Sequence, residues 1–239
     1  MKKISLAIAL VASAFMAQAQ TAQDVFNKFF DATGGKDNWE KVSVYTNKQS
    51  YKTNAPTDFD LETNISVGES SISRKKSILQ RDFFYVTKGN EGWLKIPMGS
   101  LDKAMKYDVK TLSDKEKTAM QQEIKDGVYP FLNFEQKGYT ATLVGTEKLN
   151  NADVVHVTLT GNGTKHDYYF DANTGLLSKD VETNSAETLT WEHKNYAKAA
   201  NGLSYPSESV YTSSKDKKNV NVKTEITFKD KLDPVLFVR

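Results

Sequence analysis

The chain has 239 residues, and its 32 basic and 30 acidic side chains give a formal net charge of only +2. A surface this close to neutral argues against a nucleic acid or an anionic membrane as the main partner. The sequence contains no cysteine, so no disulfide holds the fold together and a buried core must stabilise it.

The first 19 residues have the three parts of a secretory signal peptide. A basic start, Met1-Lys2-Lys3, precedes an apolar run from Ile4 to Met16 and the small-residue site Ala17-Gln18-Ala19. The apolar run is too short to span a bilayer. We therefore expect cleavage after Ala19 and export to the periplasm as a protein that is not integral to the membrane. We expect no lipid anchor, because that anchor requires a cysteine directly after the cleavage site.

Residues 21–35 predict a short amphipathic helix. Thr21 and Asp24 are spaced like a capping box, and Gly34-Gly35 is a typical helix stop. Its large apolar side chains have helical spacing, so this face must pack against a sheet. They are Val25, Phe26, Phe29 and Phe30.

From Trp39 the hydrophobic period changes to two. Residues 59–67 alternate between apolar and polar side chains, which indicates a strand with one buried and one wet face. Such strands are typical of an antiparallel sheet. Further strands are predicted at residues 41–51, 71–79, 82–88 and 91–96.

The stretch from Met98 to Phe134 interrupts this strand pattern. Residues 97–111 show no clean period, and Ser113 and Glu116 form a capping box for a helix that ends near Lys125. Methionine is an adaptable apolar side chain, and all three that follow the signal peptide lie here. They are Met98, Met105 and Met120. The stretch is suited to cover a sheet. The pattern fits two alternatives equally well: a cover that closes over a ligand, and a helix that packs onto the protein's own core.

Strands resume at residues 139–149, and Asn162-Gly163 is the typical type I′ turn of a tight hairpin. Pairing outward from this turn separates apolar from polar side chains, which supports the register. The pairs on one face are Leu159 with His166, Val157 with Tyr168, and Val155 with Phe170; those on the other are Thr160 with Lys165, Thr158 with Asp167, and His156 with Tyr169. Later strands are predicted at residues 176–183, 188–197, 203–213 and 219–229.

These elements predict a mainly β protein with helices, of the α+β class. We expect an incompletely closed antiparallel β-barrel of about 10–11 strands, covered by a helical lid. Residues 20–239 are expected to form a single domain, with the lid inserted at about 98–137, and the protein is expected to be a monomer.

Several short motifs occur in an order that resembles the outer-membrane lipoprotein-sorting superfamily, in particular the LolA-like proteins of the Bacteroidetes. They are Gly34-Gly35 with Trp39, Gly92-Trp93 to Pro97, Gly138-Tyr139, residues 143–147, Tyr168 to Asp171, residues 174–177, Tyr196, Gly202 and Tyr205-Pro206. The resemblance implies an unclosed barrel whose helical lid covers an apolar cavity, and a role in carrying acyl chains across the periplasm. It also implies a basic residue inside the barrel that holds the lid closed, but the sequence alone matches no lysine or arginine to that position.

The predicted function is therefore binding or carriage of a lipid, acyl chain or other apolar ligand, in outer-membrane lipid or lipoprotein trafficking. The alternative is an envelope protein-interaction module, accessory to a peptidase or an outer-membrane assembly, in which the lid packs tightly and leaves no cavity. The candidate cavity residues, for each of which core packing is an equal interpretation, are Trp93, Ile96, Met98, Leu101, Met105, Met120, Ile124, Phe131, Leu132 and Phe134.

No motif in the sequence indicates catalysis, a metal or a cofactor. His156 and His166 fall on opposite faces of the predicted hairpin, and His193 lies in another strand. The sequence has no metal-ligand spacing, nucleophile elbow, P-loop or dinucleotide fingerprint. Paired carboxylates for glycoside cleavage stay open, as in any β protein. The basic runs Arg74-Lys75-Lys76 and Lys215-Asp216-Lys217-Lys218 are interpreted as solvated strand ends rather than docking patches.

Overall fold

The computed structural model describes residues 21–53, 58–100 and 105–239, and the predicted signal peptide lies outside these ranges. In the described residues, thirteen strands form one antiparallel sheet. The strands are β1 (Val44–Lys52), β2 (Phe59–Ser66), β3 (Ser71–Ile78), β4 (Arg81–Lys88), β5 (Glu91–Met98), β6 (Lys106–Thr111), β7 (Tyr139–Leu149), β8 (Ala152–Gly161), β9 (Thr164–Asp171), β10 (Leu177–Thr183), β11 (Thr188–Lys198), β12 (Ser204–Ser213) and β13 (Val220–Phe228).

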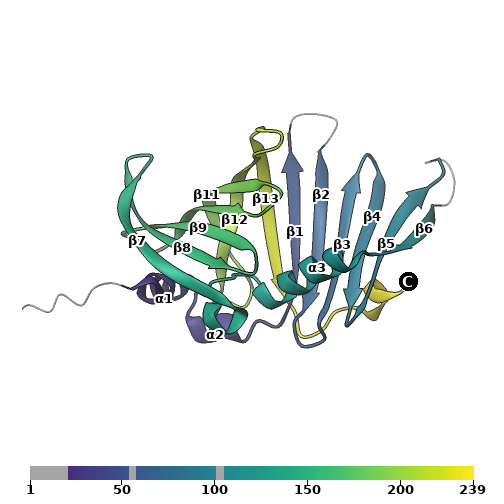
Figure 1. Ribbon diagram of the computed structural model, residues 1–239, viewed down its shortest axis with the longest axis horizontal. Helices are drawn as coiled ribbons and strands as arrows, with labels where there is room; N and C mark the ends of the chain where they lie inside the picture. Colours follow the sequence, from purple (N-terminus) through teal and green to yellow (C-terminus); the bar gives the residue numbers. More distant parts are fainter. Residues whose placement is uncertain (1–20, 54–57, 101–104) are drawn as a thin grey trace, which may run out of the picture.

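The strand order places the two ends of the sheet far apart. It runs β6-β5-β4-β3-β2-β1-β13-β12-β11-β10-β9-β8-β7, so that the first and last strands of the chain pair in the middle. β6 and β7, which are consecutive in the chain, form opposite edges. The segment between them therefore crosses the face of the curved sheet, and Figure 1 shows its helix α3 (Asp114–Asp126) lying across the strands. The predicted fold class, an unclosed antiparallel sheet with a helical cover, is confirmed.

Two details of the predicted fold are wrong. The sheet has 13 strands rather than 10 or 11, and β6 was missing from the prediction because all six of its side chains are exposed and give no alternating signal. In addition, the period of two predicted from Trp39 begins later, because Trp39 lies in a short helix, α2 (Lys36–Glu40), and β1 begins at Val44. The Trp39 indole donates a hydrogen bond of 3.0 Å to the Thr33 hydroxyl, which fixes it beneath the first helix.

The hairpin predicted from Asn162-Gly163 is confirmed. Both turn residues have positive φ, as a type I′ turn requires, and β8 pairs with β9 in the predicted register on both faces. The two predicted capping boxes are also present, at Thr21 and at Ser113.

The first helix, α1 (Ala22–Ala32), builds an aromatic core against β8 and β9. Phe26, Phe29 and Phe30 are fully buried. Ring contacts of Phe29, with centroids 5.0 to 5.7 Å away, reach Phe30, Tyr129, Phe131 and Phe170. Two of these partners belong to the segment that follows α3, so the core fixes that end of the crossing segment to the sheet. Downstream, the 3₁₀ helix η1 (Phe134–Lys137) leads into β7.

The two faces of the sheet have different covers. We call the face that α1 and α3 cover the inner face. Cross-strand partners share a face, so Leu94 and its partner Tyr85 lie on the inner face and pack with the α3 cluster. Their neighbours Trp93 and Val86 face the other way. This outer face is covered near β4 by the C-terminal 3₁₀ helix η2 (Pro234–Phe237).

Gly92 allows α3 to approach β5 closely. A Cβ atom at this position would lie 2.8 Å from the Lys117 side chain of α3. The carbonyl of Gly92 also accepts a 3.0 Å hydrogen bond from the amide of Leu112, just before the helix. Among the described helices, none is long and apolar enough to cross a membrane.

The aromatic core should dominate stability. We predict that Phe29→Ala lowers the free energy of unfolding by about 3–5 kcal/mol, because it leaves a cavity among buried rings. Val144→Ala, at a side chain that is 58% exposed, is the control and should change it by less than about 0.5 kcal/mol. Chemical denaturation measures both, and equal small effects would contradict this view of the core.

Candidate functional site

Two cavities lie on the inner face along the same side of α3, one beside its N-terminal half and one beside its C-terminal end. We call the first, of about 430 Å³, the aromatic cavity; it lies between α3 and the central strands. It is lined by Tyr51, Phe59, Leu61, Arg74, Lys76, Tyr85, Leu112, Glu116, Ala119, Met120 and Tyr211. An apolar hollow with several aromatic side chains pointing into it is a candidate binding site.

Stacked rings form the floor of the aromatic cavity. The rings of Tyr51 and Phe59 stack at 4.3 Å, and Tyr211 meets Tyr51 edge-on at 5.8 Å. The Lys76 ammonium lies 4.4 Å from the centre of the Phe59 ring. Burial raises the pKa of Tyr51 well above its usual range, so its hydroxyl stays protonated and the cavity wall stays neutral there.

We call the second, of about 280 Å³, the polar cavity; it lies between β9–β13 and the segment after α3. Its lining combines apolar rings with many polar groups. The residues are Tyr45, Asn47, Gln49, Thr63, Ile65, Glu123, Gly127, Val128, Tyr129, Pro130, Phe131, His166, Tyr168, Leu177, Asp180, Glu182, Trp191, His193, Pro206, Ser209, Thr224 and Ile226.

Three neighbouring strands contribute a connected polar cluster to this cavity. The His193 Nε2 atom lies 2.7 Å from Asp180 Oδ1, and its Nδ1 atom lies 2.9 Å from the Ser209 hydroxyl. The side chains of Asp180 and His193 are only 20% and 9% exposed. Both ring nitrogens of His193 are thus engaged, and its orientation is fixed.

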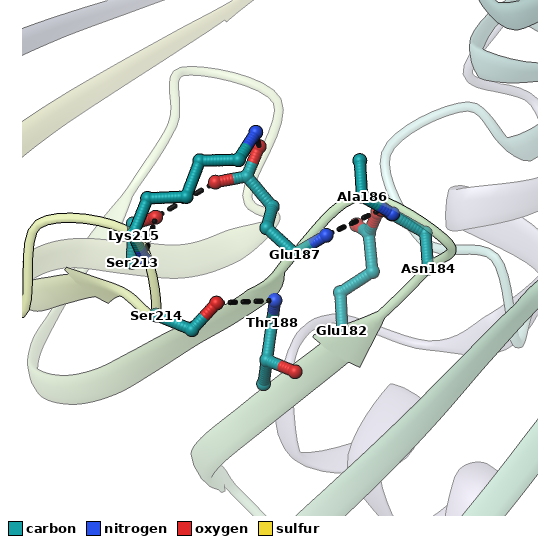
Figure 2. A network of polar contacts seen from close by, with 8 residues as sticks. All are labelled: Glu182, Asn184, Ala186, Glu187, Thr188, Ser213, Ser214 and Lys215. Carbon is teal, nitrogen blue, oxygen red and sulfur yellow. Dashed lines mark hydrogen bonds and ion pairs between the residues drawn. The ribbon is translucent and has the colours of Figure 1, made fainter.

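A second polar network holds the ends of these strands together (Figure 2). Glu187, in the turn between β10 and β11, accepts hydrogen bonds from the Ser213 hydroxyl at 2.7 Å and from Lys215 Nζ at 3.2 Å. The Thr188 amide donates to the Ser214 hydroxyl at 3.0 Å. The turn after β10 is therefore tied to the end of β12, which fixes the strands that carry Asp180 and Ser209.

Arg74 of β3 connects the sheet to α3. Its guanidinium pairs with the Glu123 carboxylate of α3, and its Nε donates a 3.2 Å hydrogen bond to the Thr63 hydroxyl. The prediction of a solvated strand end at Arg74-Lys75-Lys76 is wrong for Arg74 and Lys76, which both lie on the inner face and line the aromatic cavity. The sequence missed these two basic residues because a run of three cations does not show which of them point inward.

Lys137 fixes the end of α3 that is nearer to β7. Its ammonium donates to the backbone carbonyls of Asp126 at 2.7 Å and Tyr129 at 2.9 Å. The Tyr139 hydroxyl donates to the Asp126 carboxylate at 3.0 Å. Burial lowers the pKa of Lys137 to about 8, and burial raises the pKa of Asp126.

The structure places the predicted cavity residues in different environments. Met120 lines the aromatic cavity, Phe131 lines the polar cavity, and Ile124 is buried beneath α3. Leu132 and Phe134 pack in the aromatic core with α1, so for these two residues core packing, rather than a place in a cavity, is what the structure shows.

The remaining predicted residues lie at the far edge of the sheet or away from α3. Ile96 and Met105 are half-buried, and Met98 is 51% exposed. Trp93 points to the outer face, on the opposite side of the sheet from α3, and Leu101 lies outside the described residues. Most of the lining comes instead from inner-face strand residues, such as Tyr51 and Leu61. Their alternation was visible in the sequence, but it does not show which face α3 covers.

The described residues contain no group of three or more His, Asp or Glu side chains placed to hold a metal ion. His156 lies on the outer face, where its Nε2 is 3.0 Å from the Asp167 carboxylate.

Comparison of the sequence with family models and with curated proteins gives no match. Among solved structures, the chain is similar to the LolA superfamily protein NE2245 from Nitrosomonas europaea, with a TM-score of 0.55 and 14% identity over 92% of this chain and 99% of that chain. The chain has the LolA fold. A putative outer membrane lipoprotein-sorting protein domain from Vibrio parahaemolyticus gives a TM-score of 0.49 and 16% identity over 90% and 94% of the two chains. The lipoprotein LppX of Mycobacterium tuberculosis gives a TM-score of 0.32 and 7% identity over 87% of this chain and 95% of that chain.

The Arg74 to Glu123 contact should hold α3 against the sheet. We predict that Arg74→Met speeds amide hydrogen exchange in α3 by up to about fivefold, because a partly exposed ion pair contributes about 0.2–1 kcal/mol. Lys75→Met is the matched control: it removes a neighbouring cation whose partner, Glu62 at 3.8 Å, is on the outer face. Faster exchange in both variants, or in neither, would contradict this role.

Lys137 should titrate far below its ordinary pKa of 10.5. The folded protein binds the Lys137 proton less tightly than the unfolded chain does, so we predict that this group adds stability as the pH rises from about 8 towards 10.5. NMR of methylated lysines should show one resonance that titrates near pH 8 and disappears in Lys137→Met. A normal titration for every lysine would contradict the prediction.

Proposed function

We propose that this protein is a periplasmic binding or carrier protein that holds a lipid, an acyl chain or another apolar ligand between the inner face of its sheet and α3. We further propose that it acts without catalysis, as a monomer with a single domain from residue 20 onwards, in outer-membrane lipid or lipoprotein trafficking. The aromatic cavity of about 430 Å³ beneath α3 is the observation that carries the proposal.

The chemistry of the aromatic cavity suits an acyl chain. Tyr51, Phe59 and Leu61 offer apolar surface, and Met120 on α3 is an adaptable side chain that fits chains of different shape. Burial of apolar area contributes about 25 cal/mol per Å², so a chain enclosed here needs no charged recognition group to bind.

The attachment of α3 is compatible with opening and closing. Met120 and Ile124 are its buried side chains, so little apolar surface holds it to the sheet. The contact between Arg74 and Glu123 adds one partly exposed ion pair. An element with few buried contacts opens at low free-energy cost, and this supports a lid that admits a ligand.

A protein-interaction module with a tightly packed lid is the competing function. The two cavities beside α3 argue against it, because such a module requires no hollow on the inner face.

The ligand itself is the direct test. We predict that native mass spectrometry and organic extraction of the protein, purified after export, recover a bound lipid, and that an environment-sensitive apolar dye binds saturably. Recovery of no lipid together with no saturable dye binding would contradict the proposal.

A pair of tryptophan variants locates the binding site. Leu61→Trp fills the aromatic cavity and should weaken dye binding at least about tenfold, which corresponds to about 1.4 kcal/mol. Glu62→Trp adds the same ring at the next position of β2, on the outer face, and should leave binding unchanged. Equal effects of the two variants would place the dye elsewhere.

A further inference from the structure

We propose that the polar cavity binds the head of the ligand, and that this head is a hydrogen-bond donor without negative charge, best a protonated amine. A carboxylate or phosphate head is disfavoured there. This inference rests on the proposed binding of an apolar chain and adds the chemistry of the group attached to it.

The charges around the polar cavity favour a donor. Its lining contains the carboxylates of Glu123, Asp180 and Glu182, whereas no lysine or arginine is among its described lining residues. Glu123 is already paired with Arg74. Asp180, by contrast, is partnered within the described residues only by His193, through one of its two oxygens. These carboxylates would repel an anionic head.

Two buried polar atoms in the cavity lining lack partners. The Tyr129 hydroxyl and the Asn47 Oδ1 atom make no hydrogen bond within the described residues. The Tyr129 side chain is only 7% exposed. Buried polar groups are almost always hydrogen-bonded, so these atoms indicate a missing partner. A donor satisfies the Asn47 Oδ1 atom, and the Tyr129 hydroxyl can accept from a donor as well.

The acceptor on Asp180 is held in place before any ligand arrives. His193 is fixed between Asp180 and Ser209, and the turn after β10 is tied to the end of β12 by the network in Figure 2. A carboxylate that does not need to reorganise binds a donor with less loss of entropy. We assign His193 and Ser209 a positioning role.

The two cavities are neighbours with the pair of Arg74 and Glu123 between them, and a ligand that reaches past this pair contacts both. Arg74 lines the aromatic cavity, while its partners Glu123 and Thr63 line the polar cavity. Likewise the hydroxyl of Tyr51, in the aromatic cavity, donates at 3.2 Å to Gln49 in the polar cavity. A chain in the aromatic cavity thus places its head towards Asp180.

Three probes with the same chain and different heads test the proposal: decylamine, decanol and decanoate, each measured by calorimetry on the protein without its signal peptide at pH 7. We expect decylamine to bind at least tenfold more tightly than decanoate. Asp180→Asn should reduce the ratio of the decylamine and decanoate affinities at least threefold. Its affinity for decanol should stay within about twofold of that of the unchanged protein. Asp153→Asn, which neutralises an exposed carboxylate of β8 outside the cavity, should leave the ratio unchanged.

A second variant keeps the test valid if Asp180→Asn does not fold. Asn47→Leu removes the unpartnered acceptor. It should weaken the binding of decylamine more than the binding of decane, a chain of the same length without a polar head. Equal affinity for decylamine and decanoate overturns the head-group inference, and so does an Asp180→Asn variant in which the ratio of these two affinities is unchanged. In either case, binding of decanol still supports the proposed function. If none of the three headed probes binds, the proposed function fails, and this inference fails with it.

Discussion

The two edges of the sheet impose the constraint on which the rest of the structure depends. Because β6 and β7 are consecutive in the chain but lie at opposite edges, the segment that joins them must cross the inner face. The sheet therefore acquires a cover without any separate domain. Since the sheet is curved and the crossing element is a single helix, α3, space remains beside it on the inner face, and the two cavities lie in this space.

The cover is attached to the sheet at both ends and is held more loosely between them. After α3, Tyr129 and Phe131 are buried among the rings of α1, and Lys137 donates to the carbonyl of Asp126, the last residue of the helix. The helix itself rests on a narrow apolar stripe and on Glu123. Before α3, Leu112 is buried and its amide donates to the Gly92 carbonyl of β5, so only the helix between these two anchors is held by few buried contacts.

Local signals in the sequence were sufficient for much of the fold. The capping boxes, the apolar stripe of α1 and the Asn162-Gly163 turn each depend on a few neighbouring residues, and the structure confirms them. β6 could not be predicted, because pairing with β5 alone forms it and its side chains are all exposed. The site was harder still. Alternation shows that a strand has two faces, but only the tertiary path of the chain decides that Leu61 lies beneath α3 and Trp93 does not.

Quenching of tryptophan fluorescence by a brominated acyl chain measures most directly where a ligand lies. Trp191 lines the polar cavity on the inner face, whereas Trp93 is buried on the outer face. In single-tryptophan variants that retain only Trp191 or only Trp93, with Trp39 also replaced, the brominated chain should quench Trp191 saturably and leave Trp93 unaffected. Quenching of Trp93, or of neither residue, would contradict a ligand held between the sheet and α3.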